Sequence, residues 1–228
     1  MRRTALQSTA RINPIVPRYL RDQALDPLKD AIVTGGLAPG EPIVIDALAA
    51  AFGLSSMPVR EAVKRLVADG LVEELPPRRA HRVAPLTRRS ALDVIEVTET
   101  LIVRAYEVGV PRLDDAGIAE MRRALDSATA HARGGDLLAA LAAIHGLHGV
   151  VYSATGNAEY ARTLRALVPR FNRILYLWYG ESIREVGTSY RRDVVEALER
   201  GDRKSAVKVV RAAWRRFHDV VAAREDET

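Results

Sequence analysis

The stretch from residue 53 to residue 71, GLSSMPVREAVKRLVADGL, constrains the fold of this chain more than any other. Its apolar residues recur at the three- and four-residue spacing of an α-helix, which places them on one buried stripe: Val59, Ala62, Val63, Leu66 and Val67. Ser55 is a candidate N-cap, Pro58 fits the first turn of a helix, and Asp69 with Gly70 forms a C-terminal stop. The sequence therefore predicts a sharply bounded amphipathic helix.

The opposite face of this helix carries Met57, Arg60, Glu61 and Lys64. Cationic side chains near the start of such a helix are typical of DNA recognition, because its first turns meet base edges and its dipole favours phosphate. This face by itself is ambiguous, since many solvated helices also carry arginine and lysine. The neighbouring segments decide between the two interpretations.

Two helices are expected before this one. Apolar spacing predicts them over residues 19–34 and 46–52, the second capped by Asp46, with Gly53 as the tight turn that follows. Pro27 is an alternative start for the first helix, because proline is tolerated in a first turn. Three helices with a tight turn between the second and third form a helix-turn-helix.

A hairpin is expected directly after it, with strands at residues 71–75 and 81–84 and a turn between them. The tip of this wing is expected to carry Arg78, Arg79 and Arg82, and basic residues there suit minor-groove or phosphate contacts, although a solvated hairpin of the same composition is the alternative. We expect DNA contacts from the hairpin arginines and from the recognition helix: Arg78, Arg79, Arg82, Ser55, Ser56, Met57, Pro58, Arg60 and Lys64.

The runs LKDAIVTGGLAPGE and LAAAFGLSSMPVREAVKRLVADGLVE resemble the DNA-binding domain of the GntR family of bacterial transcription regulators over residues 19–86. The resemblance implies a winged helix-turn-helix that binds a palindromic operator in double-stranded DNA as a homodimer. Two arginines usual in the family are replaced, by Ser56 and Asp46, and the glycine common at the wing tip is Ala80. Arginine bound to guanine is the commonest base contact, so we expect an altered operator and more dependence on Arg60 and Lys64.

Helices alone are predicted beyond residue 87. Their expected spans are 88–110, 114–133, 136–154, 157–179, 188–200 and 202–224, separated by glycine or proline stops, and they form an antiparallel bundle. The runs HGVVYSATGN and EALERGD resemble the FCD-type ligand-sensing domain that follows the winged helix in the FadR branch of the family. Six helices rather than seven resemble the VanR-like subgroup.

Many FCD domains hold a divalent metal with one aspartate and three histidines. The corresponding positions here are Ile144, His148, Arg191 and Ala213, so one ligand of four is present. His145 adds an imidazole on the same helix face as His148, but no carboxylate is expected beside them. We therefore predict no metal and no other cofactor.

Arg191 suggests a different chemistry for the sensing domain. A guanidinium in the bundle interior would clamp a carboxylate through two parallel hydrogen bonds, which predicts a small organic acid as effector. The alternative is that Arg191 lies at the surface or pairs with Asp193 or Glu196. The candidate effector contacts are Thr98, His148, Tyr152, Asn172, Arg173 and Arg191.

Composition limits the other function classes. The formal charge of +5 over 228 residues permits a nucleic-acid partner, and the absence of cysteine excludes disulfides and a thiolate nucleophile. Apolar runs shorter than a membrane span, and no signal peptide, predict a soluble cytoplasmic protein without a membrane partner. No phosphate-binding loop or nucleophile elbow is present, so we expect no enzyme.

The sequence thus predicts a mainly α protein with an N-terminal winged helix-turn-helix and a C-terminal all-α antiparallel bundle. Its expected parts are a basic arm at residues 1–17, the DNA-binding domain at 18–86, and an effector-binding and dimerisation domain at 87–228. The predicted function is a ligand-controlled transcription regulator, favoured as a repressor. A TetR-like helical regulator, which has no wing, and an all-helical metal-dependent enzyme are the alternatives.

Overall fold

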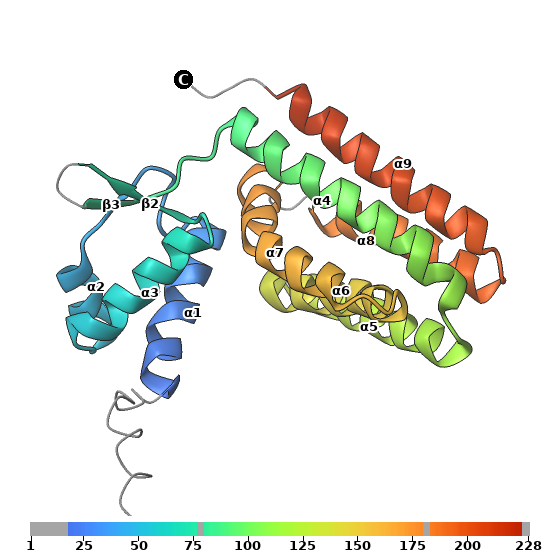
Figure 1. Ribbon diagram of the computed structural model, residues 1–228, viewed down its shortest axis with the longest axis horizontal. Helices are drawn as coiled ribbons and strands as arrows, with labels where there is room; N and C mark the ends of the chain where they lie inside the picture. Colours follow the sequence, from blue (N-terminus) through green and yellow to red (C-terminus); the bar gives the residue numbers. More distant parts are fainter. Residues whose placement is uncertain (1–17, 77–79, 180–182, 225–228) are drawn as a thin grey trace, which may run out of the picture.

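The computed structural model describes residues 18–76, 80–179 and 183–224, which pack around two hydrophobic cores (Figure 1). The first core is enclosed by three helices and a small sheet. These elements are α1 (Arg18–Thr34), β1 (Pro42–Ile43), α2 (Ile45–Phe52), α3 (Ser56–Ala68), β2 (Val72–Leu75) and β3 (Ala80–Val83). The expected helix-turn-helix and wing are therefore present.

The apolar stripe of α3 is buried as its spacing predicts. Val59, Ala62, Val63 and Leu66 are each 0% exposed, and they pack against α1, α2 and the sheet. Ser55 is the N-cap residue with extended backbone, but its side chain makes no capping bond. Gly70 adopts φ +71°, a left-handed conformation that favours glycine, and so turns the chain from α3 into β2.

α1 confirms the helix predicted over residues 19–34, and it continues through Pro27 instead of taking the alternative start there. Two other details of this part correct the sequence-based expectations. α2 begins after Val44, and the predicted cap Asp46 instead accepts a 2.7 Å hydrogen bond from the Ser56 hydroxyl. β1 was not predicted, because two residues carry no periodicity; it exists only because β3 offers a partner, giving the antiparallel order β1-β3-β2.

The second core lies inside a bundle of six α-helices within the described residues. They are α4 (Arg88–Gly109), α5 (Asp115–Arg133), α6 (Leu137–Ala154), α7 (Ala158–Tyr179), α8 (Ile183–Glu199) and α9 (Arg203–Ala222), with a 3-10 turn at Val110–Arg112. Thr87 and Ser90 form a reciprocal capping box at the start of α4. Asp114, Asp136 and Asp202 each accept a backbone N–H at the start of the next helix.

The predicted loop over residues 180–187 is wrong in part. α8 begins at Ile183 and includes Gly187, five residues earlier than expected. A glycine inside a helix costs roughly 1 kcal/mol, which a well-buried apolar face readily outweighs. Val194, Val195 and Leu198 provide that face in α8.

α6 corrects a second expectation, because it has the length and apolar composition that could cross a membrane. In the bundle it packs against α5 and α7, and its buried side chains include Leu141, Leu147 and Val151. Its apolar character therefore has an explanation in the core of the bundle.

α7 is the helix through which the bundle meets the winged helix-turn-helix (Figure 1). Arg173 of α7, 3% exposed, donates from Nη2 to the carbonyl oxygen of Ala84 at 2.6 Å. Gly35 lies against Leu177, and Gly70 lies against Arg170. Together with the packing of α7 on α1, these contacts join the two parts through α7 within the described residues.

Candidate DNA-reading helix and buried effector site

The exposed face of α3 carries the residues predicted to contact DNA. Met57 is 62% exposed, and Arg60 and Lys64 are exposed on the same helix face. Lys64 is paired with Glu61 at 2.7 Å, so its charge is partly neutralised. Ser56 and Asp46, which replace the two family arginines, are hydrogen-bonded to each other. Arg60 is therefore the principal cation of this face.

The wing differs from the sequence-based picture at Arg82. This residue lies within β3, not at the tip, and its Nη2 and Nε lie 2.8 and 3.0 Å from Glu73 Oε2 across the sheet. The alternation of side chains along β3 and the register with β2 put the two opposite each other. Arg78 and Arg79 lie outside the described residues.

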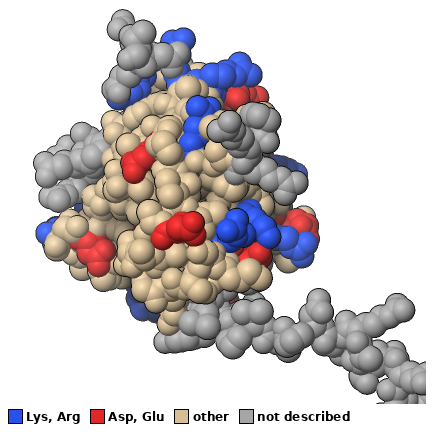
Figure 2. All heavy atoms as spheres, turned by 90° about the vertical axis from the view of Figure 1, so that its left-hand side faces the viewer, with Lys and Arg blue, Asp and Glu red and all other residues tan. Residues whose placement is uncertain are grey.

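Figure 2 shows the molecule from the side on which α2 lies. Lysine and arginine are scattered over this face, interrupted by acidic residues, and uncharged side chains cover much of the surface between them. A continuous basic band does not cross the visible face in its described part. Recognition of DNA on this side would therefore depend on a few specific side chains.

The interior of the bundle holds a polar cluster around His148, which is 3% exposed. The Nδ1 atom lies 2.8 Å from the Tyr106 hydroxyl, and Arg191 Nε donates to Nε2 at 3.3 Å. Because a guanidinium is always a donor, Nε2 must accept, and the imidazole proton then resides on Nδ1 and is donated to Tyr106. The Tyr106 O–H is thereby left to donate elsewhere.

Burial keeps this histidine neutral. It lowers the pKa of His148 well below its ordinary value, and the charges of Arg191 and, more weakly, His145 act in the same direction. Tyr152 stacks on the imidazole, with ring centroids 6.2 Å apart and planes 10° apart. Burial also raises the pKa of Tyr106 and Tyr152, so both phenols stay protonated donors.

Arg191 is 5% exposed, so the alternative that placed it at the surface is wrong. Its guanidinium carbon lies 4.4 Å from the centre of the Tyr190 ring, a cation–π contact. A buried cation, three phenols and a neutral imidazole from α4, α6 and α8 thus meet in the interior of the bundle.

The other predicted effector contacts have different surroundings. Asn172 Oδ1 lies 3.0 Å from His145 Nε2, and burial lowers the pKa of that histidine to about 4. The buried Thr98 hydroxyl donates to the Val94 carbonyl of its own helix at 2.6 Å. Arg173 points the other way, toward Ala84, and is therefore corrected from an effector contact to an inter-domain contact.

Tyr106 and Tyr190 were missed by the sequence reasoning. Tyr106 lies eight residues after Thr98, two helical turns along the same face, which is the signal that could have found it. Tyr190 directly precedes Arg191 and offered no comparable signal, because neighbours in a helix point in different directions.

The residues at this site do not fit the metal that FCD domains commonly hold. The described part of the chain brings together no group of three or more histidine, aspartate or glutamate side chains that could bind a metal ion. The Nε2 lone pair of His148 faces the Arg191 guanidinium, so a metal ion there would meet a fixed positive charge.

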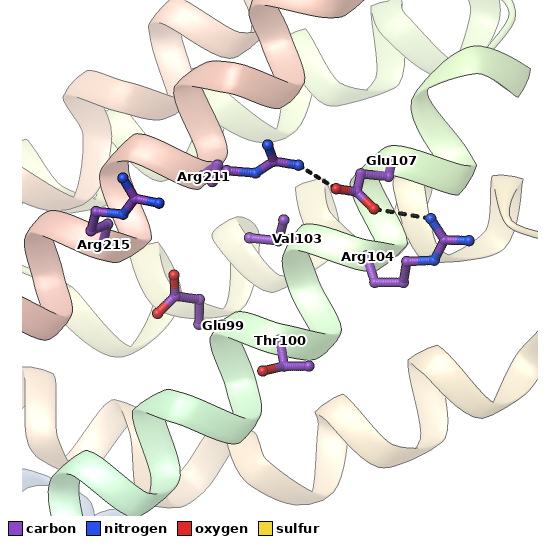
Figure 3. Close-up of a pocket in the computed structure, with 7 residues that line it drawn as sticks. All are labelled: Glu99, Thr100, Val103, Arg104, Glu107, Arg211 and Arg215. Carbon is purple, nitrogen blue, oxygen red and sulfur yellow. Dashed lines mark hydrogen bonds and ion pairs between the residues drawn. The ribbon is translucent and has the colours of Figure 1, made fainter.

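A groove lies on the outer side of the bundle between α4 and α9, with a volume of about 310 Å3 (Figure 3). Glu107 pairs with Arg104 and Arg211 within it, and the lining is completed by Glu99, Thr100, Val103 and Arg215. The Glu107 carboxylate thus already satisfies two of the three guanidinium groups that line the groove. The interior cluster therefore remains the better candidate for an effector.

Two family models match the chain in sequence order. Residues 20–81 match the bacterial regulatory proteins of the gntR family, and residues 93–216 match the FCD domain. This chain is a GntR-family regulator with an FCD domain. The matched families are transcription regulators, and the β2–β3 wing sets the chain apart from the TetR-like alternative.

The regulator resembles two other regulators in sequence, one of them along most of its length. It is 29% identical over 192 residues to the "Probable D-xylose utilization operon transcriptional repressor" of Paenarthrobacter nicotinovorans, covering 81% of this chain and 83% of that protein. It is 30% identical over 110 residues to the HTH-type transcriptional regulator YdhC of Bacillus subtilis (strain 168), covering 48% of each.

Among solved structures, E. coli McbR/YncC shares the fold with a TM-score of 0.71 at 21% identity, covering 89% of this chain and 97% of that one. A GntR transcriptional regulator from Rhodococcus sp. RHA1 gives a TM-score of 0.75 at 18% identity, covering 90% and 99%. At this level of identity the likeness concerns the fold alone.

Proposed function

We propose that this regulator is a cytoplasmic homodimeric repressor, without enzymatic activity, that binds a palindromic operator and responds to a small organic acid. Residues 18–86 would bind DNA, and residues 87–228 would dimerise and sense the effector. The observation that carries the effector chemistry is the position of Arg191, buried among neutral phenols and an imidazole.

The chemistry of this cluster favours a carboxylate. Arg191 supplies a permanent positive charge, and charge-assisted hydrogen bonds to a carboxylate are about twice as strong as neutral ones. The Tyr106 hydroxyl, which accepts from His148, has its own proton available for an acceptor atom of the ligand. Arg191, His148 and Tyr106 are each 5% exposed or less, so the bundle would have to open locally for a ligand to reach them.

Signal transfer to DNA would run through α7. Asn172 touches the cluster through His145, and the next residue, Arg173, binds the segment that leaves the wing. A ligand that displaces α7 would change the placement of the winged domain, and a dimer can bind both half-sites only at one spacing. The repressor assignment is supported by the description of the Paenarthrobacter relative.

The effector proposal is tested by thermal-shift measurements on the full chain with acetate, succinate, benzoate and, as a sugar, D-xylose. A carboxylate present at 100 times its Kd stabilises the folded state by about 2.7 kcal/mol, so it should raise the Tm of the wild type. The Arg191→Met variant should lose this shift. The exposed neighbour provides the matched control, Arg192→Met, which should keep it.

Two outcomes would overturn the effector chemistry: equal shifts in the wild type and Arg191→Met, or a response to D-xylose and to none of the acids. DNA binding is tested separately by gel shift on the DNA upstream of the chain's own gene. A dimer that binds no palindrome at low salt, with Arg60→Ala behaving like the wild type, would overturn the repressor proposal.

A further inference from the structure

Large apolar side chains are exposed at four positions within the described residues. Val97 and Val220, on the bundle, are 49% and 50% exposed. Val44 and Met57, in the winged helix-turn-helix, are 58% and 62% exposed. Met57 is thus the most exposed of the four, and it lies in the first turn of the recognition helix α3.

A hydrogen bond fixes the surroundings of Met57. The Ser56 hydroxyl donates to Asp46 Oδ1 at 2.7 Å and ties the first turn of α3 to the first turn of α2. Val44 lies two residues before Asp46, and Met57 directly follows Ser56, so the bond joins the two segments that expose apolar side chains. Met57 also shares its helix face with Arg60 and Lys64.

The same bond limits the polar contacts that the first turn of α3 can make. The proton of Ser56 is used on Asp46, and the Asp46 carboxylate supplies the negative charge that a helix N-terminus favours. A phosphate would be repelled at this position. The group that the first turn presents outward is therefore the apolar end of Met57.

One base offers a match for that group in the major groove. Thymine carries a C5 methyl there, whereas adenine, guanine and cytosine present only hydrogen-bonding groups and ring atoms. We propose that Met57 reads a thymine methyl group in each half-site of the operator. The proposal rests on the DNA binding proposed above and assigns a base preference to one side chain of that interface.

The experiment starts from a pool of random duplexes, from which the full-length wild type selects its operator. Each thymine of the selected site is then replaced singly by deoxyuridine, which lacks only the methyl group. Burial of one methyl group corresponds to about a fourfold change in affinity, so one thymine per half-site should show a loss of that size. Met57→Leu should keep this loss, and Met57→Ala should abolish it.

Two controls separate the outcomes. Val97→Ala removes an exposed apolar side chain from the bundle. This variant should bind the selected operator and its deoxyuridine-substituted versions like the wild type. If an operator is selected but deoxyuridine affects the wild type and Met57→Ala equally at every position, the Met57 assignment is overturned while DNA binding stands. If the wild type selects no sequence, the proposed DNA binding fails, and the assignment fails with it.

Discussion

The Arg173 guanidinium donates a 2.6 Å hydrogen bond to the carbonyl oxygen of Ala84, and so attaches the helical bundle to the segment that leaves the wing. The preceding residue, Asn172, points in a different direction and contacts His145 beside the buried polar cluster. Two adjacent residues of α7 therefore contact the candidate sensor and the DNA-binding part. This arrangement supports the coupling through α7 proposed above.

Replacing Arg173 should weaken the coupling more than the fold. In Arg173→Met the Ala84 carbonyl loses its partner, which should lower the free energy of unfolding by about 1–2 kcal/mol. The effector should bind as in the wild type but release DNA less effectively. Urea unfolding, effector titration and gel shift measure the three quantities. Arg165→Met, at an exposed position of the same helix, is the control; a full effector response in Arg173→Met would contradict the prediction.

Two glycines in the bundle should respond oppositely to alanine. A Cβ at Gly109 of α4 would meet the backbone carbonyl oxygen of Val151 in α6, so Gly109→Ala should destabilise the fold by about 1–3 kcal/mol. A Cβ at Gly146 has no neighbour within 4 Å, and Gly146→Ala should stabilise the helix by about 0.5–1 kcal/mol. Chemical denaturation of both variants checks the pair. Equal effects of the same sign would refute the close packing of α4 on α6.

Stability should fall on mild acidification because of the buried histidines. Burial lowers the pKa of His145 from 6.5 to about 4 and lowers that of His148 well below the same value. The unfolded chain then binds more protons than the folded one below pH 6.5. The free energy of unfolding therefore has its full value above pH 6.5. It decreases toward pH 4 by about 1.4 kcal/mol per pH unit for each histidine.

Urea unfolding at pH 7.5, 6 and 5 measures this dependence. The window stays above the range in which most carboxylates titrate, so the histidines dominate the slope. His145→Gln removes one of the two buried imidazoles and should reduce the slope, whereas the fold stays intact at pH 7.5. A slope unchanged by this substitution would show that His145 is not the titrating group.

Arg82 and Arg60 should contribute unequally to DNA binding. Arg82 is bound to Glu73 across the sheet. To contact a phosphate it must either break this ion pair or bind with the Glu73 carboxylate still beside it, whose negative charge repels the phosphate. Arg60→Ala should therefore weaken operator binding by about tenfold, within the usual range for a base contact, and Arg82→Ala by less. Gel shifts at two salt concentrations compare them. Glu73→Gln is informative as well, since releasing Arg82 should strengthen binding.

Most features of the recognition helix α3 were predicted from the sequence. Its apolar stripe, its glycine stop and the wing behind it follow from short-range periodicity and turn chemistry, which act within a few residues of the chain. The same local rules predicted the starts of α5, α6 and α9 to within one residue. Where a strong local rule was absent, as for the two-residue strand β1, prediction failed.

The residues of the candidate sites were predicted only in part. Thr98, His148, Tyr152, Asn172 and Arg191 were predicted as a group, but Tyr106 and Tyr190 were not, because their roles depend on which helices become neighbours. Arg173 and Arg82 were placed at sites by their type and position in the chain. Their partners, Ala84 and Glu73, are determined by inter-domain packing and by strand register. The spacing of residues in the sequence predicts neither partner.

The sequence by itself determined the kind of protein: a winged helix-turn-helix followed by a helical bundle, since helix periodicity, caps and stops are local properties. Only the tertiary structure decided that Asp46 and Ser56 bond to each other and that Arg191 meets His148. It also decided that Arg173 serves the junction of the two parts. These contacts join residues that are not neighbours in the chain, and they stabilise the protein only once the surrounding helices have packed.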